Sequence, residues 1–134
     1  MKYLIQFFTS ILFIIFFISN ASANNKIKIG LVVPLSGENK DLGESILKSI
    51  RLAVNDINDD RILIIPKDNQ NSPEQTLKVS KELYENDVKI IIGPVFKKNT
   101  LKLDELNNDI IFLSFTNKII GTNKNIISAG VNSF

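Results

Sequence analysis

Short apolar runs alternate with amphipathic stretches along the chain from residue 26 onward. Runs of β-branched and other apolar residues have the length and composition of buried strands. They occupy residues 27–33, 61–65, 88–92 and 110–113, and residues 125–129 predict the start of a fifth strand. Pro34, Pro66 and Gly93 follow the first three runs and mark their ends, because proline cannot donate to a strand ladder and glycine favours turns.

The stretches between these runs have helical periodicity. Residues 41–58 carry apolar side chains at spacings of three and four, which predicts one apolar stripe along a helix. We expect a second helix to begin at Pro73, with Ser72 capping it and Gln75 reaching back. Its inner face would consist of Leu77, Ser80, Leu83 and Tyr84.

A third, shorter helix is predicted over residues 100–107, with Leu103 and Leu106 facing inward. The resulting order is β-α-β-α-β-α-β, followed by the possible fifth strand. Continuous apolar strands separated by amphipathic helices predict an α/β fold with a doubly wound parallel sheet covered on both faces. Right-handed crossovers then favour an open sheet.

The first 23 residues have the pattern of a secretory signal peptide. Lys2 supplies the positive start, residues 11–18 are continuously apolar, and Ala21-Ser22-Ala23 has the small-x-small form of a cleavage site. The alternative is an uncleaved membrane anchor, but Gln6 and residues 9–10 interrupt the apolar stretch, and a spanning helix needs about 20 apolar residues. We therefore expect cleavage before Asn24 and export, to the periplasm if the source is Gram-negative.

Composition excludes several kinds of chemistry. The 134 residues contain no Cys and no His, so thiolate metal sites, disulfides and histidine bases are absent. With 16 basic and 14 acidic residues the net charge is +2, and no block of like charge supports nucleic-acid binding. No G-x-G-x-x-G, P-loop or G-x-S-x-G motif occurs, no metal-ligand spacing is visible, and the scattered carboxylates of Glu38, Asp41 and Asp68 are weak evidence for catalysis.

Topology alone indicates where a ligand would bind. In an open parallel sheet, ligands bind at the carboxyl ends of the strands. The candidate loops are residues 34–40, 68–72, 93–99 and 114–117, which we expect to lie along one edge. Small, hydroxyl and amide side chains dominate these loops, and helices begin beside them, which suits a carboxylate or another small polar anion.

Several of these residues also have a purely structural interpretation. Ser36-Gly37 can simply turn the chain, and Asp68-Asn69 can form an Asx-turn before the second helix. The hydroxyls of Ser114 and Thr116 can bond backbone instead of a ligand, and Lys97-Lys98 can be a solvated pair. Gly93 can be no more than the end of a strand.

An ordered set of segments resembles one known family. Residues 27–37 (IKIGLVVPLSG), Leu42-Gly43 and residues 52–58 (LAVNDIN) are similar to the start of type I periplasmic binding proteins, most closely those that bind leucine, isoleucine and valine. The resemblance continues through residues 68–74 (DNQNSPE), 88–94 (VKIIIGP) and 112–114 (FLS). It therefore covers essentially all of the chain after the leader.

This resemblance implies a fold of two doubly wound lobes that close over a solute. It implies a non-enzymatic solute-binding protein of an ABC importer, with a small amino-acid-like or amide solute, a membrane permease as partner, and no cofactor or metal. Lys97 stands where amino-acid binders have a hydroxyl residue, and Leu42 where some relatives have an aromatic one. The implied ligand-binding residues are Ser36, Gly37, Leu42, Asp68, Gly93, Lys97, Ser114 and Thr116.

A second branch of the same fold also resembles parts of the sequence. Residues 93–96 (GPVF), 112–117 (FLSFTN) and 127–130 (ISAG) are similar to penicillin-binding-protein activators, which contact a cell-wall synthase. In either case residues 24–134 are expected to form the N-terminal part of the first lobe, without a second lobe, as a fragment, split gene or truncated product. A single wall of a site would bind solute weakly.

Overall fold

The computed structural model describes residue 1 and residues 26–106, 109–117 and 124–130. The predicted signal peptide lies outside these residues, apart from Met1. The helices and strands, in chain order, are β1 (Ile27–Val33), α2 (Lys40–Ile57), β2 (Ile62–Asp68), α3 (Pro73–Glu85), β3 (Ile90–Ile92), α4 (Lys97–Lys102), the 3-10 turn η1 (Leu103–Glu105), β4 (Ile111–Ser114) and β5 (Ile126–Ser128).

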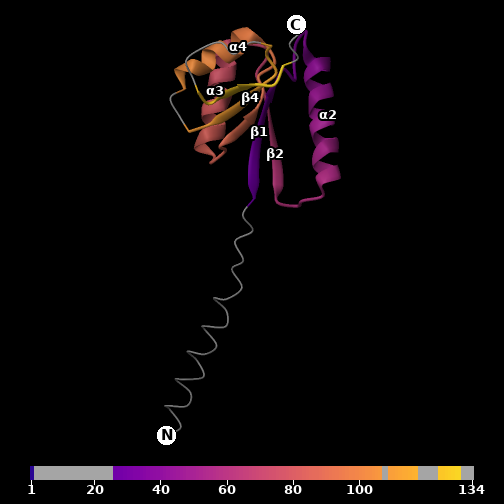
Figure 1. Ribbon diagram of the computed structural model, residues 1–134, viewed down its shortest axis with the longest axis vertical. Coiled ribbons are helices and arrows are strands. Elements are labelled where there is room, and N and C mark those ends of the chain that lie inside the picture. Colours follow the sequence, from indigo (N-terminus) through magenta and orange to yellow (C-terminus); the bar gives the residue numbers. More distant parts are fainter. Residues whose placement is uncertain (2–25, 107–108, 118–123, 131–134) are drawn as a thin grey trace.

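The five strands form one parallel sheet in the order β2-β1-β3-β4-β5. The helix α2 lies on one side of this sheet, and α3 and α4 lie on the other (Figure 1). The predicted doubly wound α/β fold is therefore confirmed. No helix in the described part of the chain is long and apolar enough to cross a membrane.

The face toward α3 and α4 holds the main core. One row across the sheet is formed by residues in register, namely Ile65, Gly30, Ile91, Phe112 and Ile126. Leu83 of α3 lies directly over the gap at Gly30, where an added Cβ would come within 2.7 Å of its Cδ1 atom. The other buried members of this cluster are Val32, Val79, Val88, Leu103, Leu106 and Ile110.

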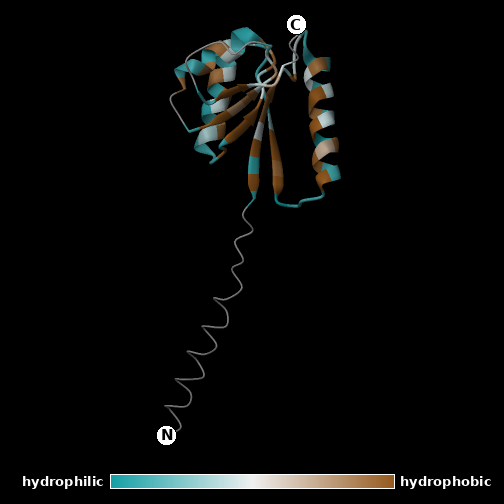
Figure 2. Cartoon of the chain, in the orientation of Figure 1, coloured by the Kyte–Doolittle hydropathy of each residue, from teal (hydrophilic) through white to brown (hydrophobic). Residues whose placement is uncertain are grey.

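The opposite face is covered unevenly, because Leu31 and Val33 of β1 are fully buried there but residues of β4 and β5 are not. Gly43 is the one buried residue of α2 among those described. Because side chains alternate along a strand, the residues next to the core row point toward the α2 side. Two of them, Ile111 and Ile127, are 45% and 50% exposed, although the strands are strongly apolar (Figure 2). The prediction of helices on both faces of the sheet is confirmed, but in the described part of the chain the cover on the α2 side does not reach Ile111 and Ile127.

Several predicted boundaries shift. β2 continues through Pro66 to Asp68, because it is an edge strand and the missing N–H of proline faces no partner strand. The third helix begins at Lys97, three residues early, and its end tightens into η1. Ser72 does cap α3 by accepting a hydrogen bond from the Gln75 N–H, but the side chain that meets Ser72 is that of Glu74, not Gln75.

Candidate functional site

Hydrogen bonds join the four predicted loops into one edge. The Leu35 N–H donates to the Asp68 carboxylate at 2.8 Å, which links the loops after β1 and β2. The Asn99 side-chain amide donates to Asn71 Oδ1 at 3.2 Å, which links the loop after β2 to α4. The Phe115 N–H donates to the Pro94 carbonyl at 3.1 Å, which links the loops after β3 and β4. The expectation of a common edge is confirmed.

Asp68 organises the β1 and β2 ends of this edge. Its carboxylate also accepts from the Gln70 N–H at 2.8 Å, so the predicted Asx-turn is present. Partial burial acts to raise the pKa of the Asp68 carboxyl, but hydrogen bonds from Ser36, Gln70 and Leu35 outweigh burial and lower the pKa overall. The carboxylate is therefore held in place as an anion by neighbouring loops.

A buried amide chain continues from this point toward α4. The Asn71 N–H donates to Asn69 Oδ1 at 3.1 Å, and the Asn69 side-chain amide donates to Thr76 Oγ1 at 3.1 Å. Asn69 and Asn99 are fully buried. The amide oxygen of Asn99 is buried and accepts no hydrogen bond from the part of the chain that the structure describes. These contacts fix the loop after β2 against the starts of α3 and α4.

Hydroxyl groups brace the β3 and β4 ends. Ser114 Oγ lies 2.9 Å from Thr100 Oγ1 and donates to the Pro94 carbonyl at 3.1 Å. It also lies 3.2 Å from Thr116 Oγ1 and accepts from the Thr116 N–H at 3.3 Å. Ser114 is fully buried, so its hydroxyl bonds backbone and neighbouring hydroxyls, as the structural interpretation predicted.

Gly93 has a specific steric reason to be glycine. Its φ is +105°, a conformation that other residues rarely adopt, and an added Cβ would lie 2.1 Å from the Val32 carbonyl oxygen. The absent side chain lets the end of β3 pass close to β1. This close approach places Pro94 and Val95 where the loop turns outward into α4.

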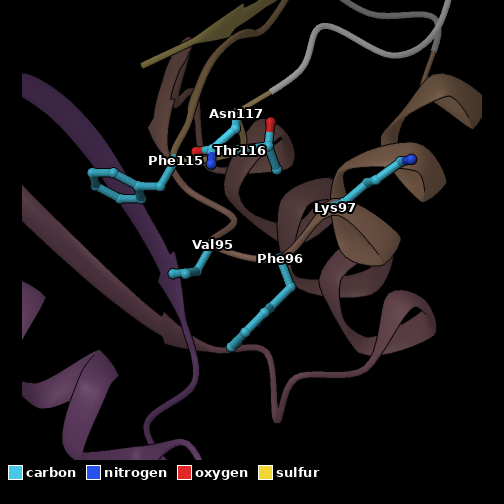
Figure 3. A pocket seen from close by; sticks show the side chains of 6 residues that line it. All are labelled: Val95, Phe96, Lys97, Phe115, Thr116 and Asn117. Atoms are coloured by element: carbon cyan, nitrogen blue, oxygen red, sulfur yellow. The ribbon is translucent and has the colours of Figure 1, made fainter. Parts of the chain in front are cut away.

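A pocket of about 360 Å³ opens between the β3 and β4 ends. It is lined by Val95, Phe96, Lys97, Phe115, Thr116 and Asn117. Figure 3 shows Val95 and Phe115 on one side of this group and Lys97 on the other, with Thr116 between them. Thr116 is buried, whereas Phe96 and Phe115 are only half-buried, so aromatic surface remains available beside polar atoms.

The structure brings together only part of the predicted set. Lys97 and Thr116 line the pocket, with Ser114 bonded to Thr116 and Gly93 at the end of the adjoining strand. Ser36, Gly37, Leu42 and Asp68 belong to the same edge but are not among the residues that line the pocket.

Sequence reasoning did not single out Val95, Phe96 and Phe115, although all three lie in the predicted loops. The available signal was an aromatic residue in each of two loops, Phe96 after β3 and Phe115 after β4. Among the described residues, no group of three acidic, histidine or cysteine side chains could hold a metal ion.

Known proteins show the same architecture. The sequence model of the family described as "Periplasmic binding protein" matches residues 26–132. No protein of curated function matches the chain in sequence. Many solved structures do resemble it, and three of them serve as examples.

A solute-binding protein of an ABC transporter from Rhodopseudomonas palustris BisB5, in complex with 3,4-dihydroxybenzoic acid, has a TM-score of 0.63 and 26% identity over 68% of this chain and 27% of its own. An ABC transporter substrate-binding protein from Sphaerobacter thermophilus has a TM-score of 0.63 and 23% identity over 67% of this chain and 26% of its own. A branched-chain amino acid transporter substrate-binding protein from Streptococcus pneumoniae, in complex with isoleucine, has a TM-score of 0.57 and 24% identity over 66% of this chain and 28% of its own.

Proposed function

Since the chain belongs to the periplasmic binding protein family, with a type I fold, we propose that the pocket between β3 and β4 is one wall of a solute-binding site that serves an ABC importer. The observation that carries this proposal is the position of the pocket. It lies at the carboxyl ends of neighbouring parallel strands, where open α/β sheets bind ligands.

Local rigidity supports the same function. Ser114 and Thr116 are fixed by hydrogen bonds to each other and to the Pro94 carbonyl, so the polar floor of the pocket is ordered before a solute arrives. A prearranged wall reduces the conformational entropy lost on binding. Half-buried aromatic side chains beside this floor offer apolar contact area.

The matched part of the chain spans about a quarter of the length of the solved structures described above, from 26% to 28%. A single wall buries one side of a solute, so we expect weak binding, with a Kd on the order of millimolar. We propose a small amino-acid-like, amide or aromatic carboxylate solute, with contacts from Lys97 and Thr116. Two of the named relatives are in complex with isoleucine and with 3,4-dihydroxybenzoic acid, which supports the first and the last of these classes.

The proposed setting is the extracytoplasmic space. It depends on the signal peptide predicted in residues 1–23, and the proposed partner is a membrane permease. The same proposal assigns no chemistry to the chain, only reversible binding. The transporter proteins among the similar structures favour this role over regulation of peptidoglycan synthesis.

A titration of the purified, ¹⁵N-labelled chain tests solute binding. The panel contains branched-chain and aromatic amino acids, their amides, and benzoates. We expect saturable shifts of the backbone amide signals of Val95, Phe96, Phe115, Thr116 and Asn117. The amides of the last turn of α2, which leads into the start of β2 and so lies at the opposite edge of the sheet (Figure 1), provide the internal control.

A Thr116→Val variant sharpens the titration. It keeps the shape of the side chain and removes the hydroxyl, so it should weaken binding while the spectrum retains the pattern of a folded sheet. If a folded chain shows no saturable shift with any member of the panel, the proposed function is wrong.

A further inference from the structure

The polar and apolar groups of the pocket lie at opposite sides. Val95 and Phe115 provide apolar surface on one side, and Lys97 provides a positive charge on the other (Figure 3). In that view the Lys97 ammonium group points away from Val95 and Phe115. The pocket therefore has an apolar end and a cationic rim, separated by the Thr116 side chain.

Lys97 differs from Lys98 and Lys102 because those two lysines have an acidic side chain close by. Lys102 forms an ion pair with Glu105 at 2.6 Å. The pKa of Glu74 is lowered by its own backbone N–H, by Ser72 and, to a smaller extent, by the positive charges of Lys102 and Lys98, so Lys98 also has an acidic neighbour. Among the described residues, Lys97 has no ion pair.

The residues that line the pocket include one cation and no carboxylate. The carboxylate of Asp68, at the end of β2, already accepts hydrogen bonds from the N–H groups of Leu35 and Gln70. Strand β1 lies between β2 and β3, which separates that carboxylate from the pocket. An ammonium group on a solute would meet no opposite charge among the described residues that line this pocket.

Resting on the proposed function, we propose that the pocket selects an apolar monocarboxylate that lacks an α-ammonium group. Its hydrocarbon body, aryl or branched alkyl, contacts Val95, Phe96 and Phe115, and its carboxylate pairs with Lys97. A zwitterionic amino acid of the same skeleton binds less tightly, because its α-ammonium group lies next to the carboxylate and is repelled by the Lys97 ammonium group.

Three compounds that share one skeleton test the proposal by amide-shift titration of the full chain. They are 3-phenylpropanoate, L-phenylalanine, which adds the ammonium group, and 3-phenylpropan-1-ol, which removes the negative charge. We expect 3-phenylpropanoate to bind about twofold to fivefold more tightly than the other two, as an exposed charge pair allows. Its advantage should shrink at 0.5 M NaCl, because salt screens exposed charges.

Two lysine variants provide the matched control. Lys97→Met keeps an unbranched apolar stem without the charge, and Lys98→Met makes the same change at a neighbouring position that does not line the pocket. Lys97→Met should bring the Kd of 3-phenylpropanoate to that of the alcohol and leave the alcohol unaffected. Lys98→Met should change neither, and Lys97→Arg should keep most of the affinity for the acid.

The outcomes separate this inference from the proposed function. If L-phenylalanine binds as tightly as 3-phenylpropanoate, or if Lys97→Met leaves the affinity for the acid unchanged, the solute class is wrong while solute binding stands. If none of the three compounds, and no amino acid or amide, shifts the pocket amides of the folded chain, both proposals fail.

Discussion

The two faces of the sheet differ in how completely helices cover them. Toward α3 and α4, Leu83, Ile91 and Phe112 are almost completely buried in one cluster. Toward α2, Leu31 and Val33 of β1 are fully buried, whereas Ile111 and Ile127 of β4 and β5 are about half exposed. The strands supply similar apolar residues to both faces. Coverage therefore depends on which strands a helix lies over, not on the hydrophobicity of the strands.

The difference has an energetic consequence. Apolar surface stabilises the fold in proportion to the area that is removed from water, at about 25 cal/mol per Å². The α3 side should hence supply most of the stability of the described part. The pocket lies at the end of the sheet, where Ser114 and Thr100 of the well-packed side brace its floor.

Neighbouring isoleucines on opposite faces offer the largest contrast. Ile110 is fully buried, whereas Ile111 is 45% exposed. We expect Ile110→Ala to lower the free energy of unfolding by about 2–5 kcal/mol, and Ile111→Ala by about 1 kcal/mol or less. Urea denaturation followed by circular dichroism measures both. The pair Ile126→Ala and Ile127→Ala should show the same order, and equal losses within each pair would contradict the difference between the faces.

A single glycine tests how tightly α2 is attached. An added Cβ at Gly43 would lie 1.7 Å from the Pro34 carbonyl oxygen, so Gly43→Ala must push the start of α2 away from the end of β1. We expect a loss of about 1–3 kcal/mol or more, measured by thermal unfolding. At Gly37, which has a φ of +72° and open space around it, alanine should cost only about 1 kcal/mol. A smaller loss at Gly43 than at Gly37 would show that α2 is loosely held.

Two buried hydroxyls on the α3 side should respond in opposite ways. Ser80 Oγ is buried without a hydrogen-bond partner among the described residues, whereas Ser114 Oγ is bonded to Thr100 and Pro94. Ser114→Ala should cost about 1–2 kcal/mol, and Ser80→Ala should be neutral or stabilise by up to about 1 kcal/mol. Differential scanning calorimetry of both variants decides this. A clear loss for Ser80→Ala would indicate a buried water bonded to that hydroxyl.

The smallest expected effect is the pH dependence of stability that comes from Asp68, at the end of β2. The pKa of Asp68 is lowered in the folded chain, so its stabilising contribution is complete above the unfolded value of about 3.9 and is lost as the pH falls through the folded value. Asp68→Asn should cost about 1 kcal/mol at pH 7. The stability difference from the natural chain should narrow below about pH 4, measured by urea denaturation at several pH values. A constant difference would exclude this linkage.

Much of the fold was predictable because it depends on local patterns. The periodicity of residues 41–58 predicted α2 within one residue at each end, and Ser72-Pro73 marked the start of α3. The ends of β2 and α4 were less predictable. Pro66 is tolerated because β2 is an edge strand, and strand order is not encoded in local periodicity.

The candidate site was predictable as an edge but not as a set of side chains. Hydroxyl and amide residues at strand ends indicated the four loops that hydrogen bonds bring together. Polarity favoured Ser36 and Asp68 as ligand contacts, yet Asp68 is engaged by neighbouring N–H groups. Phe96 and Phe115 were passed over because an aromatic residue after a strand fits the core as well as a pocket.

The sequence by itself determined which segments along the chain become strands and helices, the parallel α/β class and the loops that carry polar groups. Each of these depends on residues a few positions apart. Tertiary structure decided which face is covered and which side chains line the pocket. Those features depend on strand order and on hydrogen bonds between residues 20 or more positions apart, such as Asn71 with Asn99 and Pro94 with Ser114. Only the folded chain brings such residues within the distance at which they can bond.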